Sequence, residues 1–401
     1  MTAKERRQVR KGYNFNRFTV QTALALLKNK VIKENNIHLE HYKPKAKSFI
    51  LIANHSDAMD PGIQMVALGK YIRYVASDHT TRMKMGWIFT RIGGVIVKYR
   101  DRPSSVLTEE IIRNVQAGIP VGLHAEGAIT VNGQTGFISE NTGKLVKDSG
   151  VALVTYRCVG GYLRKPRWAN TKRNGPLIGH FVNEYSAEEL SKLSVEEITE
   201  IIRRDTYVNA YEEQRKEAHD YEGENLAECV ERVLYVCPRC GEVGALHSKG
   251  NFLSCDCGYK VEMKKDGFFH DCGEGLIHDN VLDWDLWQRD VWKEKVLSAE
   301  KGSVIFTETQ QKVKKVDIDS EEILTENGTI TLYPEKFVVS LDGTKEDIVM
   351  DMDKIKQLSL AGKDTVLVVD DKIFLDIGSA LPRSSTKYIA AWRYLTGKEY
   401  K

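Results

Sequence analysis

The sequence predicts an α/β fold at the start of the chain, then a small cysteine-bearing segment, then an antiparallel β domain that ends in a helix. Three observations carry this prediction. Apolar strand-like runs alternate with helical stretches through roughly the first two hundred residues, which is typical of a sheet covered by helices. Two pairs of closely spaced cysteines follow. Beyond about residue 303, short strands alternate with tight turns.

The predicted strands of the first part are short apolar runs. They cover residues 49–53, 71–76, 94–99, 121–123 and 152–156. Between the third and fourth runs, Ile111, Ile112 and Val115 have helical spacing, and Gly118 ends that pattern. The segment from Ser194 to Glu197 is a capping box, so a later helix is expected to begin there.

Polar side chains follow three of these strands. They are His55 and Asp60 after the first, Lys98 and Arg100 at the end of the third, and His124, Glu126 and Gly127 after the fourth. Because parallel strands end at the same edge of a sheet, we expect these groups to converge there. A neutral histidine accepts a hydroxyl proton near neutral pH, and Asp60 can bond the other ring nitrogen of His55 and fix its tautomer.

Each of these residues also has a plainer interpretation. Asp60 followed by Pro61 fits the first turn of a helix. Arg100 offers a planar fork that suits a phosphate, and Lys98 alternates with it along the strand, but both also fit solvated charges at a strand end. Glu126 fits a carboxylate that holds a loop closed, a partner of substrate hydroxyls, or a cap. The residues alone leave these alternatives open.

The order of the blocks resembles the glycerolipid acyltransferase family, typified by 1-acylglycerol-phosphate acyltransferase. The family blocks are Asn-His-x4-Asp, Gly-x-Ile-x-x-x-Arg and x-Pro-Glu-Gly. This chain has Asn54-His55-x4-Asp60, then Gly94-Val95-Ile96-Val97-Lys98-Tyr99-Arg100, then Ala125-Glu126-Gly127. A last apolar block is represented by residues 150–154. The resemblance covers roughly residues 15 to 215, about half of the chain.

The resemblance implies a direct acyl transfer without a catalytic metal. His55 would be the base, Asp60 its orienting acid and Arg100 a phosphate ligand, while Glu126 and Gly127 would belong to the acceptor site. The donor would be acyl-CoA or acyl carrier protein. The acceptor would be a lysophospholipid, and 1-acylglycerol-3-phosphate is the leading choice.

Two departures from the family pattern concern the acceptor. The third block usually continues Gly-Thr-Arg-Ser, but Gly127 is followed by Ala128, so a second phosphate-binding arginine is missing, and Ala125 replaces the usual proline. Losing one of two cations that face a dianionic phosphate should weaken its binding. An acceptor with a smaller charge, or compensation by His124 or Lys98, is therefore an alternative.

Four cysteines predict a structural Zn²⁺ site in a zinc ribbon. They are Cys237, Cys240, Cys255 and Cys257. The second pair is one residue tighter than usual, so Cys272 and His270 are alternative ligands. Seven cysteines without a secretion signal fit a reducing compartment better than disulfides. We expect a role in folding, with contact to a partner as a second role, and no part in catalysis.

The last hundred residues predict an antiparallel sheet and a closing helix. The pairs Asn327-Gly328, Asp342-Gly343 and Asp370-Asp371 are hairpin signals. The helix is expected to begin near Ser384 or Ser385, with Tyr388, Ile389, Trp392 and Leu395 on one stripe. This order is similar to a pleckstrin-homology (PH) or GRAM-like barrel in architecture.

We therefore expect four parts: an acyltransferase-like domain over 1–220, a zinc ribbon over 230–275, a tryptophan-rich connector over 276–302, and a PH/GRAM-like domain with its helix over 303–401.

Net charge and hydropathy limit the kinds of partner that the sequence predicts. The net charge of +2 does not call for nucleic acid. The apolar stretch from Phe18 to Leu27 falls short of the roughly 20 residues that span a bilayer, and no cleavage site follows it. Leu24, Leu27 and Val31 have helical spacing, so this helix either lies on an anionic bilayer or packs on its own domain. We expect a cytoplasmic protein, peripherally associated with the inner face of the cell membrane.

Two hypotheses of different classes remain at this point. The leading one is a peripheral acyltransferase of glycerolipid synthesis, which the intact His55 and Asp60 pair favours. The rival is a non-catalytic lipid-binding or scaffolding protein that recruits partners through the zinc ribbon and β domain, which the missing arginine after Gly127 favours. A milder alternative changes only the lysolipid acceptor.

Overall fold

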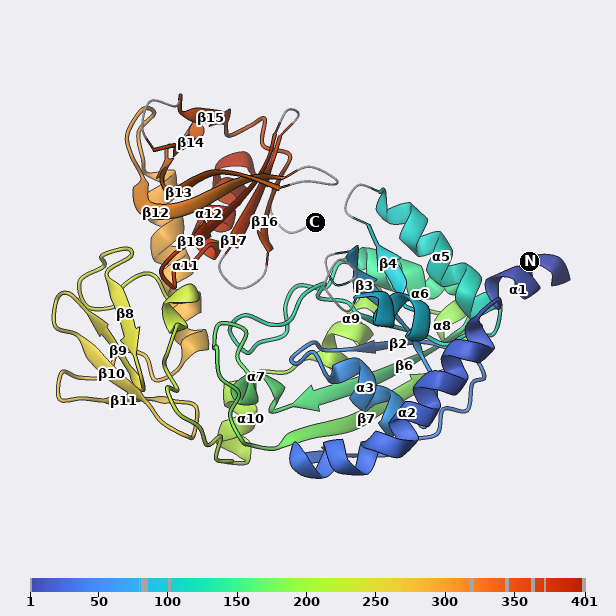
Figure 1. The fold of residues 1–401 in the computed structure, drawn as a ribbon. Coiled ribbons are helices and arrows are strands. Elements are labelled where there is room, and N and C mark those ends of the chain that lie inside the picture. The colour runs from blue at the N-terminus through green and yellow to red at the C-terminus, as the bar shows by residue number, and fades with distance from the viewer. Residues whose placement is uncertain are drawn as a thin grey trace. The chain divides into compact units, whose positions relative to one another are not determined.

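The computed structural model describes residues 2–78, 80, 86–99, 102–316, 321–342, 346–361, 365–370 and 373–398. The chain forms two compact units. The first contains residues 1–165 and 174–221, and the second contains residues 166–173 and 222–401. Each unit has its own sheets and its own core (Figure 1).

The first unit is built on a seven-stranded sheet. Its strands are β1 (Ile37–Leu39), β2 (Phe49–Ala53), β3 (Arg73–Ser77), β4 (Ile96–Lys98), β5 (Val121–His124), β6 (Ala152–Val159) and β7 (Leu177–Tyr185), in the order β1-β7-β6-β2-β5-β3-β4. Strands β2 to β6 are parallel to one another, and β7 is antiparallel to β6. The predicted α/β sheet is confirmed. The sequence did not predict β1, which is very short, or β7, which mixes polar with apolar residues.

Helices cover both faces of this sheet (Figure 1). The described helices of this unit are α1 (Ala3–Val9), α2 (Tyr13–Glu34), α3 (Asp60–Ala67), α5 (Ser104–Gln116), α6 (Glu140–Ser149), α7 (Gly161–Arg164), α8 (Ala187–Ser191), α9 (Val195–Thr206) and α10 (Ala210–Lys216), with a π-helical turn at Ile88–Ile92. Ile50 and Ile52 of β2 pack in one core with α5, α6 and α9, and Phe49 and Leu51 pack in another with α3. Burial on both faces explains why β2 reads as an unbroken apolar run.

Helix α2 is partly packed and partly exposed. Tyr13 and Asn16 are buried at its start, and Val31 and Ile32 pack near its end. Between them, Phe18 stays exposed. Among the residues that the structure describes, no helix has the length and apolar character that crossing a bilayer requires.

The second unit contains two antiparallel sheets and a long helix. The smaller sheet has β8 (Leu246–Lys249), β9 (Phe252–Cys255), β10 (Lys260–Met263) and β11 (Phe269–Asp271), in the order β11-β10-β9-β8. The larger has β12 (Phe306–Val316), β13 (Glu321–Leu332), β14 (Lys336–Ser340), β15 (Ile348–Asp351), β16 (Gln357–Ala361), β17 (Thr365–Val369) and β18 (Phe374–Ser379), in the order β15-β14-β13-β12-β18-β17-β16. Helix α12 (Thr386–Thr396) closes the chain, as predicted, and begins after Ser385.

Helix α11 (Val281–Leu297) occupies most of the predicted connector. Its Trp284 and Trp292 are fully buried. The indole N–H of Trp284 donates to the carbonyl of Val236 at 2.9 Å, and that of Trp292 donates to the carbonyl of Lys387 at 2.8 Å. The helix therefore packs against both the cysteine-bearing segment and the closing helix of the larger sheet.

One predicted hairpin is wrong. Strand β13 runs without interruption through Asn327 and Gly328. Gly328 lies opposite Gln311 at a register shift, where a Cβ on the glycine would lie 3.0 Å from the carbonyl oxygen of Ser340. The glycine therefore permits a close backbone approach inside the sheet instead of a turn. Gly343 and Asp371 lie outside the described residues.

Candidate active site

The loop that carries the predicted base is fastened to the sheet by Asn54. Its Nδ2 donates to the carbonyl of Cys158 at 2.8 Å, and its Oδ1 accepts from the backbone N–H of Cys158 at 2.7 Å. Cys158 belongs to β6, the neighbour of β2. Both residues are buried, so this two-way bond fixes where the chain leaves the carboxyl end of β2.

The structure brings His55 and Asp60 into direct contact. Nδ1 of His55 lies 3.0 Å from Oδ2 of Asp60, and the two side chains are 20% and 0% exposed. The same carboxylate oxygen accepts the backbone N–H groups of Ser56 at 2.8 Å and Asp57 at 3.0 Å. Burial raises the pKa of Asp60, and the bond from His55 opposes that rise. The carboxylate therefore orients both the ring and its own loop.

Asp60 is also the first residue of α3, and Pro61 follows in the first turn. The helix does begin at this position, but its N-cap residue is Met59, and Oδ2 of Asp60 accepts backbone N–H groups of the preceding loop. The positive end of the helix favours a carboxylate at this position. With Nδ1–H donating to Asp60, the lone pair of the imidazole lies on Nε2.

Glu126 holds two loops together. Its Oε1 accepts the backbone N–H of His55 at 2.7 Å, and its Oε2 accepts that of Gly136 at 2.6 Å. Burial raises the pKa of Glu126 to about 7. Of the roles weighed for this residue, the contacts match a carboxylate that closes a loop. Gly127 follows with φ +74°, a left-handed conformation that side chains rarely adopt.

A second histidine that the sequence placed only as a possible phosphate ligand lies against the first. The rings of His55 and His124 are stacked, with centroids 4.1 Å apart and planes 7° apart. Desolvation lowers the pKa of His124 well below its ordinary value of 6.5, so the ring is neutral near neutral pH. It therefore does not supply the charge of the missing arginine. Strands β2 and β5 pair Ala53 with His124, which sequence spacing does not reveal.

Of the two predicted cations, the structure describes Lys98, which lies apart from His55. Lys98 ends β4, and β5 and β3 lie between β4 and β2 in the sheet. With strands about 4.8 Å apart, three spacings separate the backbones by about 14 Å. The Lys98 side chain is exposed. Arg100 lies outside the described residues.

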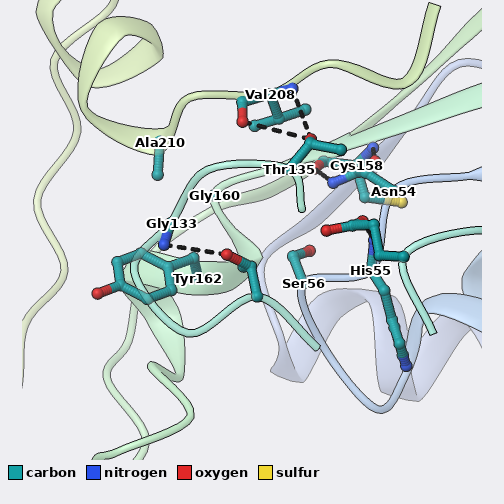
Figure 2. A pocket seen from close by; sticks show the side chains of 12 residues that line it. Asn54, His55, Ser56, Gly133, Thr135, Cys158, Gly160, Tyr162, Val208 and Ala210 are labelled. Carbon is teal, nitrogen blue, oxygen red and sulfur yellow. Dashed lines mark hydrogen bonds between the residues drawn. The ribbon is translucent and has the colours of Figure 1, made fainter. Parts of the chain in front are cut away.

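A small hollow adjoins the loop (Figure 2). Its empty volume is about 250 Å³, and it is lined by Asn54, His55, Ser56, Glu126, Thr130, Gly133, Thr135, Cys158, Gly160, Tyr162, Val208 and Ala210. No lysine or arginine is among these described residues. Figure 2 shows the His55 imidazole extending away from Tyr162, so its ring points out of the hollow.

Two groups of side chains in the described residues have the composition of a metal site. Cys237, Cys240, Cys255 and Cys257 offer four sulfur atoms within 4.8 Å of one another, and these can hold a metal ion. His55, Asp60 and His124 also lie within that distance. The two imidazole rings are parallel, so a single ion cannot lie in the plane of both, as ligation requires. The cysteines are therefore the better ligand set.

Residues 34–159 match the family model described as Acyltransferase. The matched range contains His55, Asp60, Glu126 and Gly127. The resemblance inferred from the sequence blocks is confirmed there.

Solved structures give distant likenesses. The 1-acyl-sn-glycerophosphate (LPA) acyltransferase PlsC from Thermotoga maritima is 17% identical, covers 49% of this chain and 78% of its own, and has a TM-score of 0.36. The Vps36 N-terminal PH domain is 12% identical over 24% of this chain and 80% of its own, with a TM-score of 0.20. The N-terminal PH domain of human ARAP2 is 9% identical over 26% of this chain and 89% of its own, also with a TM-score of 0.20. No curated protein matches the chain.

Proposed function

We propose that this protein transfers a fatty acyl group from a thioester to the hydroxyl of a lysophospholipid, with His55 as general base. The observation that carries the proposal is the 3.0 Å contact between Nδ1 of His55 and the buried carboxylate of Asp60. This contact leaves the lone pair on Nε2 of a ring that is 20% exposed. A base in that state is both oriented and accessible to substrate.

The transfer needs no enzyme nucleophile. Nε2 of His55 takes the proton of the acceptor hydroxyl as its oxygen attacks the thioester carbonyl carbon. The tetrahedral intermediate then collapses, the carbon–sulfur bond breaks, and the thiolate takes the proton from the imidazolium. Asp60 stays ionised and stabilises that imidazolium. Positioned base catalysis of this kind contributes about 10² to 10⁴ in rate.

For the acceptor we propose 1-acylglycerol-3-phosphate first, with Lys98 and Arg100 as phosphate ligands and Gly127 at the acceptor site. Glu126 is assigned to loop closure, because backbone donors occupy both of its oxygens. A lysolipid of smaller charge is the second candidate. The neutral state of His124 and the strand distance of Lys98 favour it.

We propose that the protein works at the cytoplasmic, inner face of the cell membrane through helix α2. Phe15, Phe18 and Leu26 are 60%, 70% and 76% exposed. Their spacing of three and eight residues places them on one side of the helix. Exposed Arg17 and Lys30 suit an anionic lipid surface.

For the four cysteines we propose structural Zn²⁺ in a zinc ribbon. A regular tetrahedron with Zn–S bonds of about 2.3 Å has edges of about 3.8 Å. The Sγ atoms of Cys237 and Cys257 lie 3.7 Å apart, and those of Cys240 and Cys255 lie 3.8 Å apart. Bound there, the ion would hold together a segment too small to build its own core.

We further propose that residues 303–401 form a PH/GRAM-like domain. The proposed domain organisation is the four parts predicted from the sequence. An antiparallel sheet of seven strands followed by a closing helix supports the PH/GRAM-like architecture. Any lipid or partner that it binds would add to membrane recruitment, without a role in the chemistry.

The test is thiol release with purified full-length protein, offered acyl-CoA and acyl carrier protein in turn, across a panel of lysolipids. We expect one donor to release thiol faster when a lysolipid is present, and His55→Ala to lose at least about 10² in rate with the fold retained. His247→Ala is the matched control, because that histidine is exposed in the second unit.

Near-normal turnover in His55→Ala would remove the base from the mechanism. If no lysolipid accelerates release from either donor, the non-catalytic lipid-binding or scaffolding function replaces the proposal.

A further inference from the structure

The two stacked imidazoles occupy adjacent strand ends. His55 follows β2 and His124 ends β5, and the pairing of Ala53 with His124 sets the two rings side by side. A ring lying flat on another restricts rotation about the bond that joins it to its own backbone. The bond to Asp60 holds one edge of the His55 ring, and the His124 ring covers one face.

His124 contacts buried Gln64, which in turn is hydrogen-bonded to buried Tyr74. Nε2 of Gln64 lies 3.4 Å from Nε2 of His124, and Gln64 is fully buried. The hydroxyl of Tyr74 donates to Oε1 of Gln64 at 2.6 Å. Because that bond uses the amide oxygen, the amide nitrogen is the atom that faces His124.

This arrangement selects one state of the His124 ring. An amide N–H donor requires a lone pair on Nε2 of His124, so the proton lies on Nδ1. A cationic ring would carry protons on both nitrogens and would oppose the Gln64 donor. The carboxylates that bond to His55 are Asp60, at the edge of its ring, and Glu126, at its backbone N–H. A neutral ring is therefore what His55 faces when it becomes an imidazolium.

We propose that His124 is a positioning residue for the transfer: its neutral ring, held by Gln64 and Tyr74, is the platform that keeps the His55 imidazole aligned between Asp60 and the acceptor hydroxyl. This inference rests on the proposed function of His55. It assigns no contact between His124 and substrate. A misplaced general base loses rate steeply, since an error of about 1 Å costs on the order of 10²-fold.

The experiment compares His124→Ala with His124→Phe. Alanine removes the platform, and we expect kcat to fall about 10- to 100-fold with both KM values within about twofold. Phenylalanine keeps a flat ring without a nitrogen, and we expect kcat within about fivefold of the wild-type value. Gln64→Leu keeps the His124 ring but removes the amide that contacts its Nε2, so we expect an intermediate loss of kcat.

A second measurement does not depend on turnover. The Nδ1 proton of His55, hydrogen-bonded to Asp60, should give a protected resonance in NMR spectra of histidine-labelled protein. We expect it in the wild type and in His124→Phe, and we expect it to broaden or vanish in His124→Ala. Thermal unfolding of each variant tests whether the fold is retained.

The outcomes separate the two ideas. Wild-type kcat and a protected proton in His124→Ala would overturn the platform. A loss in His124→Phe as large as in His124→Ala, with the proton still protected, would also overturn it, because the ring nitrogen would then matter to substrate. If the resonance behaves as expected but the wild type transfers no acyl group, the proposed function fails while the structural role of His124 stands.

Discussion

The backbone N–H of His55 donates a 2.7 Å hydrogen bond to Oε1 of Glu126. The other oxygen of Glu126 accepts the backbone N–H of Gly136. The carboxylate thus joins the loop after β2 to the loop after β5, and it sets the position of His55 without touching its ring. Loop closure and alignment of the base depend on the same group.

Replacing Glu126 with glutamine should weaken both the loop closure and the alignment of His55. The amide nitrogen cannot accept a hydrogen bond, so either His55 or Gly136 loses its partner, at a cost of about 1–3 kcal/mol. We expect a lower melting temperature and a reduced kcat. Glu140→Gln, at the start of α6, is a matched surface control. Unchanged stability and unchanged kcat in Glu126→Gln would contradict the loop-closing role.

The raised pKa of Glu126 predicts how the free energy of unfolding changes with pH. Burial raises the pKa of Glu126 from 4.5 to about 7, so folding favours its protonated form. This contribution to stability is full below about pH 4.5 and is lost as the pH rises through about 7. Urea unfolding at pH 5 and at pH 8 measures it. We expect the stability of the wild type relative to Glu126→Gln to be greater at pH 5, and the opposite order would contradict the sign.

Asp60→Asn keeps the size of the side chain and removes its charge. The ring of His55 then loses the partner that stabilises its imidazolium and selects its tautomer. We expect kcat to fall by about 10² to 10⁴ with small changes in KM. Asp57→Asn is a useful comparison, because Oδ1 of Asp57 accepts the backbone N–H of Met59 at 2.8 Å within the same loop. Equal losses in the two variants would argue that both act on the loop alone.

Substitution of one cysteine should abolish binding of the proposed Zn²⁺. We expect Cys255→Ser to lose about one zinc per chain by elemental analysis and to unfold at lower temperature, because metal binding is coupled to folding. Cys272→Ser is the matched control, since Cys272 is exposed and outside the four-cysteine group. Full zinc content in Cys255→Ser would refute this ligand set. Loss of catalysis on chelation with the fold retained would overturn the purely structural role.

A buried ion pair should stabilise the larger sheet of the second unit. Nζ of Lys387 lies 2.9 Å from Oε1 of Glu308, and the two side chains are 1% and 6% exposed. Removing the cation leaves the buried carboxylate with Arg383 at 3.8 Å and the Tyr388 hydroxyl at 2.7 Å as partners, so Lys387→Met should cost up to about 3–5 kcal/mol. Lys312 pairs with Glu326 at the surface, and Lys312→Met should cost at most about 1 kcal/mol. Equal unfolding midpoints for the two variants would refute this assignment.

Much of the local structure was predictable because it depends on neighbours in sequence. Strand β2 follows from its unbroken apolar run, the helix after Ser194 from its capping box, and the closing helix after Ser385 from helical periodicity. The closeness of His55 and Asp60 also follows, because one short loop between a strand and a helix brings them together. The hairpin at Asn327 and Gly328 was wrong because glycine serves both turns and close approaches within a sheet.

By itself, the sequence determined the strand ends that carry polar groups, the blocks of an acyltransferase domain and the spacing of four cysteines. Only the tertiary structure decided which of those strand ends are neighbours. Placing β5 beside β2 stacks His124 on His55 and brings Glu126 to its backbone, whereas placing β3 between β5 and β4 sets Lys98 apart. Strand order depends on the packing of all the helices and strands together, and no local pattern of residues encodes it.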